Sequence, residues 1–273
     1  MSIIIEKVAR NVCRILINRP AKRNALNLEL IKRLQAAIEE YEQDSRYSVA
    51  ILCGVGGNFC AGYDVAEIVD RESGMPKLHM IEQALWPLGT NLSNKKIVIA
   101  CIEGHAAGLG YELALKCDFR VGERDARMGF LNRRFGIPIM NGGTVLLPQL
   151  IGQARAFDIV ATGRAQLGYE ALDYGILNHI ADVGCAMGKA LSLSRNLAKF
   201  RNDCLMNDLN HIKLERENKS VMDSLRKERE DSLSFLRSCG PLEVAKKFLD
   251  GELCRHGGTD LGNNIASTTE VTL

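Results

Sequence analysis

Three predominantly apolar runs, at positions 12–17, 49–53 and 97–102, stand out in the first half of the chain, and the first of them contains one charged residue, Arg14. Each is rich in Val, Ile and Leu and is bounded by polar residues or glycine, which is typical of buried strands. A shorter run at 3–5 precedes the first and is joined to it by a polar turn. We expect strands at these four places and a further strand at 118–121.

Between the strands, apolar residues recur at helical spacing. From residue 28 to residue 44 they form one face, and Asn27 stands where the N-cap of a helix is expected. The residues of this face are Leu30, Ile31, Leu34, Ile38 and Tyr41. Similar spacing predicts helices at 145–162 and 170–174. Strands that alternate with helices at short intervals favour an α/β fold with a parallel sheet.

After about residue 182 the pattern becomes helical throughout. Segments 187–197, 203–231 and 242–249 have helical spacing, and the middle one is heavily charged, as expected for a solvent-exposed helix. From residue 257 onward the chain is rich in Gly, Thr and Asn, so we expect a flexible tail at 257–273.

Charge and cysteine content limit the possible function classes. The formal net charge is +2 at pH 7 and no block of basic residues stands out, which argues against nucleic acid as a partner. Nine cysteines occur singly, with no C-x-x-C pair and no zinc-type spacing to the five histidines, so we expect reduced thiols and no metal site.

The expected compartment is the cytoplasm, with the mitochondrion as the alternative. No apolar run is long enough to span a membrane, and we therefore expect no membrane partner. The first residues read as strand rather than as a targeting presequence, and the last three, Val271-Thr272-Leu273, are not the peroxisomal signal S-K-L.

Two glycine-rich loops follow apolar strands and lead towards helices. One spans residues 54–64, and the other runs from residue 103 to Glu112. Neither has the spacing of a nucleotide-binding loop. A strand that opens through glycines into a helix exposes backbone N–H groups at the positive end of the helix dipole. Two such loops could direct one N–H each at the same oxygen atom, although the second loop alone also fits a tight turn with a helix-capping glutamate.

These loops belong to an ordered series of motifs that resembles the crotonase (enoyl-CoA hydratase/isomerase) superfamily over about residues 3–180. The series is Asn18-Arg19-Pro20, Asn24-Ala25-Leu26, Phe59-Cys60-Ala61-Gly62-Tyr63-Asp64, Gly104-His105-Ala106-Ala107-Gly108-Leu109-Gly110-Tyr111-Glu112-Leu113-Ala114, Cys117-Asp118, Gly136-Ile137-Pro138, Gly142-Gly143-Thr144 and Leu147-Pro148. The resemblance implies a crotonase-type spiral of ββα units with a helical C-terminal part. It suggests a core at 1–195, a helical region at 196–256 and assembly into a homotrimer or hexamer.

The resemblance also implies an acyl-CoA site. The backbone N–H groups of Tyr63 and Leu109 would form an oxyanion hole for the thioester oxygen, and Glu112 would exchange protons with the substrate. Hydratases of the family use a second glutamate, and ungapped spacing puts Asn132 at its position. Asparagine cannot exchange protons usefully near neutral pH, so the chain departs here from the two-glutamate pattern.

Coenzyme A would contact a cationic turn and the first glycine loop. The resemblance places Lys22 and Arg23 near its phosphates and Ala61 and Asp64 near its adenine end. Lysine and arginine suit phosphate chemistry, but a solvated surface loop is the equal alternative for this turn.

Two further residues are candidates for the acyl pocket. Trp86 would either close that pocket or fill the core, and Asn141 would orient a water molecule. Cys60 and His105, in the two glycine loops, are interpreted as structural, because no general base is evident beside the thiol.

The sequence therefore predicts an acyl-CoA-processing enzyme, specifically an enoyl-CoA hydratase-like lyase that stabilises a thioester enolate. An isomerase that uses Glu112 alone and a non-catalytic acyl-CoA-binding protein remain as alternatives. An RNA-binding member of the family is disfavoured, because the helix predicted at 28–44 is mainly acidic. No cofactor is expected, since coenzyme A enters as part of the substrate.

Overall fold

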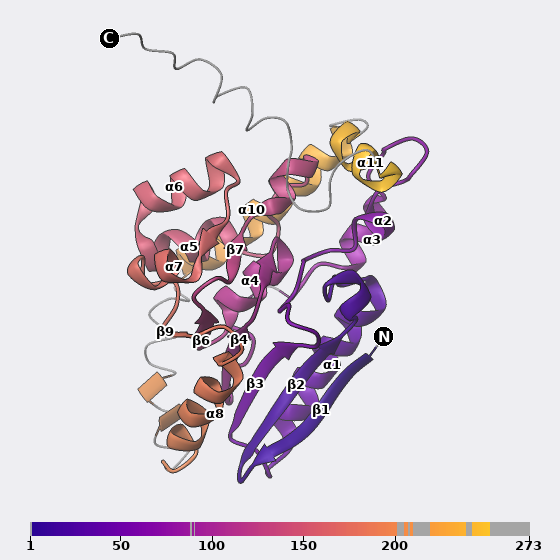
Figure 1. Cartoon of the computed structure of the whole chain (residues 1–273). Coiled ribbons are helices and arrows are strands. Elements are labelled where there is room, and N and C mark those ends of the chain that lie inside the picture. Colours follow the sequence, from indigo (N-terminus) through magenta and orange to yellow (C-terminus); the bar gives the residue numbers. More distant parts are fainter. Residues whose placement is uncertain are drawn as a thin grey trace, which may run out of the picture.

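The computed structural model describes residues 2–87, 89, 91–200, 205, 206, 208, 209, 219–238 and 242–251 (Figure 1). Its main sheet has the strand order β1-β2-β3-β4-β6-β9. The strands are β1 (Ser2–Ala9), β2 (Val12–Asn18), β3 (Val49–Gly54), β4 (Ile97–Ile102), β6 (Phe119–Glu123) and β9 (His179–Ala181). β1 is antiparallel to β2, and each later pair is parallel. The expected α/β fold with a parallel sheet is confirmed.

A second, smaller sheet carries the second glycine loop. It consists of β5 (His105–Ala107), β7 (Arg127–Gly129) and β8 (Gln166–Leu167), with β5 parallel to β7 and β8 antiparallel to β7. These strands are two or three residues long. The sequence did not predict them, because so short a strand shows no alternation of apolar and polar positions.

Helices cover both faces of the main sheet. α1 (Leu28–Gln43) packs on one face and α8 (Ala186–Leu197) on the other. Along β4 every residue is buried, and successive side chains join the two clusters in turn, as the two-residue period of a strand requires. The predicted N-cap of α1 is confirmed, because the side chain of Asn27 accepts a hydrogen bond from the Leu30 N–H at 3.0 Å.

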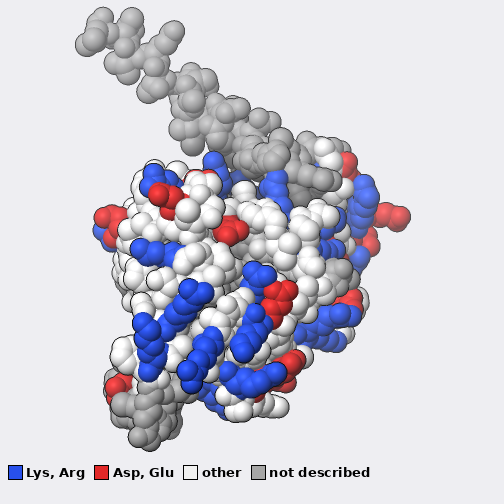
Figure 2. All heavy atoms as spheres, turned by 60° about the horizontal axis from the view of Figure 1, so that its bottom comes forward, with Lys and Arg blue, Asp and Glu red and all other residues white. Residues whose placement is uncertain are grey.

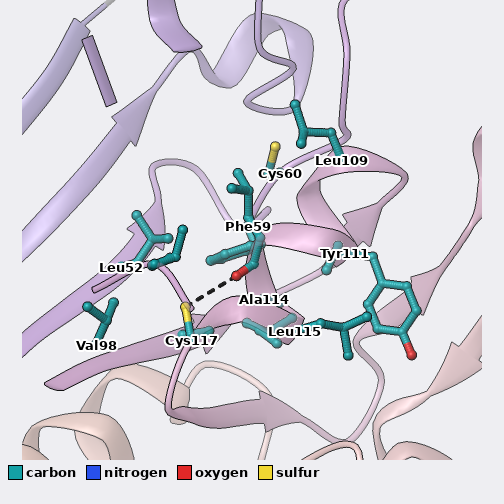
Figure 3. Packing of buried hydrophobic residues seen from close by; sticks show 14 of the residues in the cluster. Leu52, Phe59, Cys60, Val98, Leu109, Tyr111, Ala114, Leu115 and Cys117 are labelled. Atoms are coloured by element: carbon teal, nitrogen blue, oxygen red, sulfur yellow. Dashed lines mark hydrogen bonds between the residues drawn. The ribbon is translucent and has the colours of Figure 1, made fainter. Parts of the chain in front are cut away.

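Helix α4 (Leu109–Lys116) lies in the interior, and all eight of its residues are buried. Figure 3 shows its apolar side chains among those of the neighbouring strands and loops, with Cys60 close to the helix start at Leu109. At the other end, the Cys117 thiol donates to the carbonyl oxygen of Leu113 at 3.4 Å. Because α4 is enclosed, its first turn is fixed relative to both sheets.

One predicted helix is in fact two. The helical spacing at 145–162 corresponds to α5 (Gly143–Ile151) and α6 (Gln153–Thr162), which are separated at Gly152. The prediction of a continuous helix was wrong, because Gly152 has a φ of +80° and interrupts the helical backbone. The segment expected at 170–174 forms α7 (Gly168–Asp173).

The C-terminal helices pack on the segment that follows the first glycine loop. α10 (Lys219–Ser238) and α11 (Glu243–Asp250) contact the short helices α2 (Val65–Ile68), α3 (Leu78–Gln83) and η2 (Leu131–Phe135) as well as α5. Leu236, Leu242 and Ala245 form an apolar cluster with residues of α2 and α3. The predicted tail at 257–273 and residues 210–218 of the predicted charged helix lie outside the described residues.

Charged side chains are unevenly distributed on the surface. On the face shown in Figure 2, which brings the bottom of Figure 1 forward, Lys and Arg side chains outnumber Asp and Glu side chains. The sequence shows no basic block, so this clustering comes from residues that the fold brings together. Among the described residues, no helix has the length and apolar character needed to cross a membrane.

Candidate active site

The two glycine loops lie side by side and are joined by backbone hydrogen bonds. The Cys60 N–H donates to the carbonyl oxygen of His105, and the Ala107 N–H donates to that of Cys60, both at 2.9 Å. One step earlier, the Phe59 N–H donates to the Glu103 carbonyl oxygen at 2.8 Å. This parallel pairing fixes the register of one loop against the other.

Glycine is required where the loops meet. Gly62 has a φ of +90°, and a Cβ there would stand 2.7 Å from the carbonyl oxygen of Ala107 and 3.2 Å from the nitrogen of Leu109. A side chain would therefore both strain the backbone and separate the loops. Gly108, on the other loop, also has a positive φ, of +52°.

This junction brings the two predicted oxyanion-hole donors together. Tyr63 and Leu109 each follow one of these glycines, and Leu109 begins α4. Within the described part of the chain, neither backbone N–H donates a hydrogen bond. Both donors lie beside the N-terminal end of a buried helix, whose dipole adds a positive potential.

Glu112 lies in the first turn of α4 and is only 2% exposed. Its Oε1 accepts hydrogen bonds from the N–H groups of Asn141 at 2.7 Å and Gly143 at 3.1 Å, where α5 begins. Its Oε2 accepts from the Asn141 side-chain amide at 3.2 Å. These hydrogen bonds hold the carboxylate in one orientation. Their donors belong to the residues at the start of α5, so the carboxylate does not act as a cap for the first turn of its own helix, α4.

Asn141 connects Glu112 to the first glycine loop. Its amide nitrogen also donates to the hydroxyl of Tyr63 at 3.0 Å, and its Oδ1 accepts from the Trp86 N–H at 2.9 Å. Burial raises the pKa of Tyr63 above its usual value, so the phenol stays protonated. The sequence predicted Asn141 as a pocket residue but missed this network, because it joins residues far apart in the chain.

Asn132, the residue at the expected second-glutamate position, lies against the second loop. Its side-chain oxygen is 3.5 Å from the point where a Cβ on Gly108 would stand. Its amide nitrogen donates to the carbonyl oxygen of Ile137 at 2.8 Å, whereas the oxygen is buried and has no hydrogen-bond partner among the described residues. Asn132 therefore borders the same loop as the Leu109 N–H.

The residues predicted to bind coenzyme A also lie close together. The Ala61 N–H donates to the carbonyl oxygen of Arg23 at 3.0 Å, which joins the cationic turn to the first glycine loop. Lys22 is exposed and Arg23 is half-buried. Asp64 forms an ion pair with Arg19 at 2.7 Å, an interaction that the sequence did not predict.

A buried asparagine holds this cationic turn in place. Asn24 is fully buried, and its amide nitrogen donates to the carbonyl oxygens of Val55 at 2.9 Å and Asn58 at 2.6 Å. Its Oδ1 accepts from the Arg19 N–H at 2.9 Å. The turn is thereby fixed to the loop that contains Gly62.

The surroundings of three further candidates, Trp86, Cys60 and His105, fit a structural role. Trp86 is 4% exposed and packs in the main core. Cys60 is completely buried, and burial raises the pKa of its thiol to about 12, so it is no nucleophile at neutral pH. His105 pairs through Nδ1 with the Asn58 side-chain oxygen at 2.9 Å. In the described residues, no group of three His, Cys, Asp or Glu side chains is arranged to hold a metal ion.

Comparison with known proteins identifies the family. A sequence profile of the enoyl-CoA hydratase/isomerase family matches residues 7–230, so the chain belongs to this family. The putative enoyl-CoA hydratase/isomerase YngF of Bacillus subtilis is 34% identical over 71% of this chain and 74% of its own length. The peroxisomal bifunctional enzyme of Danio rerio is 32% identical over 73% of this chain, which spans just 28% of that longer protein.

Solved structures agree with the family assignment. The crystal structure of an enoyl-CoA hydratase from Mycobacterium tuberculosis H37Rv has a TM-score of 0.73 at 27% identity. The match covers 87% of this chain and 98% of that one. The crotonase-type fold predicted from the motif series is confirmed.

Proposed function

We propose that the chain is an acyl-CoA-processing enzyme of the hydratase/isomerase type. In this proposal the N–H groups of Tyr63 and Leu109 bind the thioester oxygen, and Glu112 moves a proton to or from the acyl chain. The observation that carries the proposal is the close approach of Gly62 to Leu109, at the start of the helix whose first turn contains the buried Glu112.

The chemistry follows from the charge that develops during the reaction. Removing a proton next to a thioester carbonyl places negative charge on the carbonyl oxygen, and two fixed N–H donors stabilise that charge. Each such donor contributes on the order of 3 kcal/mol to lowering the barrier. The donors are already oriented by the paired loops, so little reorganisation is needed when the charge forms.

Glu112 is the group we assign to proton transfer. Among the described residues, it and Glu123 are the two buried acidic side chains, and Glu123 lies elsewhere, at the end of β6. Since Oε1 of Glu112 is held by two backbone N–H groups, we assign the transfer to Oε2. A positioned general base contributes roughly 10²- to 10⁴-fold to the rate.

The presence of Asn132 favours isomerisation as a second candidate beside hydration. Moving a double bond requires one base that takes a proton and returns it elsewhere, which a single carboxylate can do. Hydration requires both activation of water and protonation of carbon, so Glu112 would have to serve in both steps. Asn132 lies against the second loop, but its amide has no proton to exchange and cannot take over one of these two steps.

A panel of CoA thioesters tests this proposal. Saturated, 2-enoyl and 3-enoyl thioesters would be incubated with the protein and followed by mass spectrometry, and exchange of the α-proton in D2O by NMR. A gain of one water identifies a hydratase, and an isomer of unchanged mass identifies an isomerase. Binding with neither turnover nor exchange identifies a non-catalytic acyl-CoA-binding protein and overturns the enzymatic proposal.

A further inference from the structure

Helix α4 buries a lysine one turn after Glu112. Lys116 is 2% exposed, although a lysine is seldom buried so completely unless it is paired. Taking its ammonium group out of water is costly unless polar or charged groups surround it. Residues four apart on a helix lie on the same face, with Cβ atoms about 6 Å apart, so Lys116 is on the Glu112 side of α4.

Both side chains reach the same turn. The Lys116 Nζ is 3.7 Å from the point where a Cβ on Gly142 would stand. The Glu112 carboxylate binds the N–H groups of Asn141 and Gly143, the two neighbours of Gly142. The Lys116 ammonium and the Glu112 carboxylate, both on α4, therefore lie next to the same turn, the one that precedes α5.

Lys116 also holds the segment that contains Trp86. Its ammonium donates to the carbonyl oxygen of Gly89, and its own carbonyl oxygen accepts from the Leu92 N–H at 2.9 Å. These bonds alone would fit a purely structural role, and an experiment must separate that role from an electrostatic one.

We propose that Lys116 is a positioning residue for Glu112, whose buried positive charge keeps the carboxylate ionised and directed at the substrate. The inference rests on the proposed function, because it assigns Lys116 to the acid–base step of that reaction. An opposite charge in a poorly solvated site favours the ionised form of its neighbour. Glu112 is thereby ready to accept a proton although it is almost completely buried.

Two other ionisable groups belong to the surroundings of this carboxylate, one through a shared hydrogen-bond partner and the other at longer range. The Tyr63 phenol, from the first glycine loop, is joined to Glu112 through the Asn141 amide. The Arg229 guanidinium, from α10, donates to the carbonyl oxygen of Trp86 and acts electrostatically on Tyr63. Tyr63 stays neutral near pH 7, so Lys116 and Arg229 supply the positive charge.

The pH dependence of turnover separates the two roles of Lys116. Lys116→Met removes the charge and the hydrogen bond to Gly89, whereas Lys116→Gln removes the charge and keeps a donor. Because removing a buried cation near the carboxylate disfavours its ionised form, we expect both variants to move the acidic limb of the kcat/KM profile to higher pH by roughly one to two units. Lys189→Met, which removes an exposed charge from α8, should leave the profile unchanged.

A profile that stays in place in Lys116→Gln, with activity lost solely in Lys116→Met, would show a structural tether and overturn the inference. If Lys116→Met does not fold, Lys116→Gln carries the kinetic test.

Stability measurements test the inference independently of turnover. Glu112→Gln should lower the Tm more in the unmodified protein than in the Lys116→Gln background, because only the former has the attraction between the two charges to lose. Equal shifts would overturn the inference even if no substrate is found. If no substrate is turned over but the Tm shift of Glu112→Gln differs clearly between the two backgrounds, the proposed function is rejected, whereas the electrostatic coupling of Lys116 to Glu112 is supported.

Discussion

At the scale of single residues, Glu112 is the first group to test. Glu112→Gln keeps the size of the side chain and most of its hydrogen bonding but removes proton exchange. We expect kcat to fall by about 10²-fold or more, while the Kd for an acyl-CoA stays within about threefold, because the backbone donors are unchanged. Steady-state kinetics and calorimetry measure the two quantities.

Glu123 provides the matched control, since it is equally a buried glutamate. Its carboxylate accepts a hydrogen bond from the Gly184 N–H, away from the glycine loops. Glu123→Gln should lower stability without changing kcat by more than about twofold. If Glu112→Gln were equally active, Glu112 would serve only to anchor the start of α5.

Asn132 provides a prediction of gained activity. Asn132→Glu places a proton-exchanging group beside Gly108, and we expect faster hydration of crotonyl-CoA, measured by loss of the enoyl absorbance. The variant loses the hydrogen bond to Ile137, so stability should drop by about 1 kcal/mol. Asn132→Gln is the control, because glutamine has the same length as glutamate but no proton to exchange. A similar gain in hydration in this control would refute proton exchange as the cause.

At the scale of elements, the junction of the two loops depends on Gly62. Gly62→Ala adds a Cβ 2.7 Å from the Ala107 carbonyl oxygen at a φ of +90°. We expect the free energy of unfolding to fall by about 3 kcal/mol, together with kcat, because the donors at Tyr63 and Leu109 are displaced. Denaturant titration measures the first effect.

Gly188→Ala is the control for this substitution. Gly188 lies within helix α8, and a Cβ there would have nothing within 4 Å. Alanine at this position should stabilise the helix by roughly 0.5–1 kcal/mol and leave turnover unchanged. If Gly62→Ala and Gly188→Ala changed stability and turnover equally, a side chain at Gly62 would not cause the strain and the separation of the loops described above.

The cationic turn η1 (Pro20–Lys22) and its neighbour Arg23 are the element predicted to bind the phosphates of coenzyme A. The double variant Lys22→Ala/Arg23→Ala should weaken acetyl-CoA binding about tenfold and dephospho-CoA binding less, because one phosphate is already missing. Calorimetry measures both affinities. Equal losses for the two ligands would exclude contact with the phosphate that dephospho-CoA lacks, and no loss for either ligand would remove the assigned contacts altogether. Lys95→Ala, which removes one positive charge from an exposed turn, is the control for a general effect of surface charge.

The elements that the sequence predicted best are those with a clear period. β3 and β4 are continuous apolar runs, β2 is one apart from Arg14, and α1 shows both its cap and its apolar face, so all four were placed within a residue or two. The break at Gly152 was missed because glycine is tolerated inside helices, and only the backbone conformation reveals the interruption.

Residues for the candidate site could be named from the sequence where the motif series was dense. Tyr63, Leu109 and Glu112 were named from the resemblance of the two glycine loops to the crotonase family, and the structure describes the contact between these loops. The bonds of Glu112 to Asn141, 29 positions away, leave no pattern in the sequence. Buried Lys116 gives no signal either, because a charged residue at the end of a helix is usually solvated.

At the scale of the whole molecule, the resemblance predicts a trimer or a hexamer. Some large apolar side chains are strongly exposed in the isolated chain, among them Phe157 at 78% and Tyr169 at 61%. Burying them between subunits would account for their exposure. We expect light scattering to give three or six times the mass of the chain, and a monomer at every concentration would contradict the prediction.

Asn24 bonds to residues 55 and 58, and Glu112 bonds to residues 141 and 143. In both cases the partners are synthesised later than the residue that they hold, so the site cannot be complete when that residue leaves the ribosome. A nascent chain that has just exposed Glu112 outside the ribosome has both glycine loops but not the turn that orients the carboxylate. Until residue 143 emerges, Glu112 has no backbone donor from α5, and the carboxylate must stay hydrated. Because a domain generally folds as a unit, the proposed oxyanion-hole donors and the proposed base can take their places together only after residue 143 has emerged.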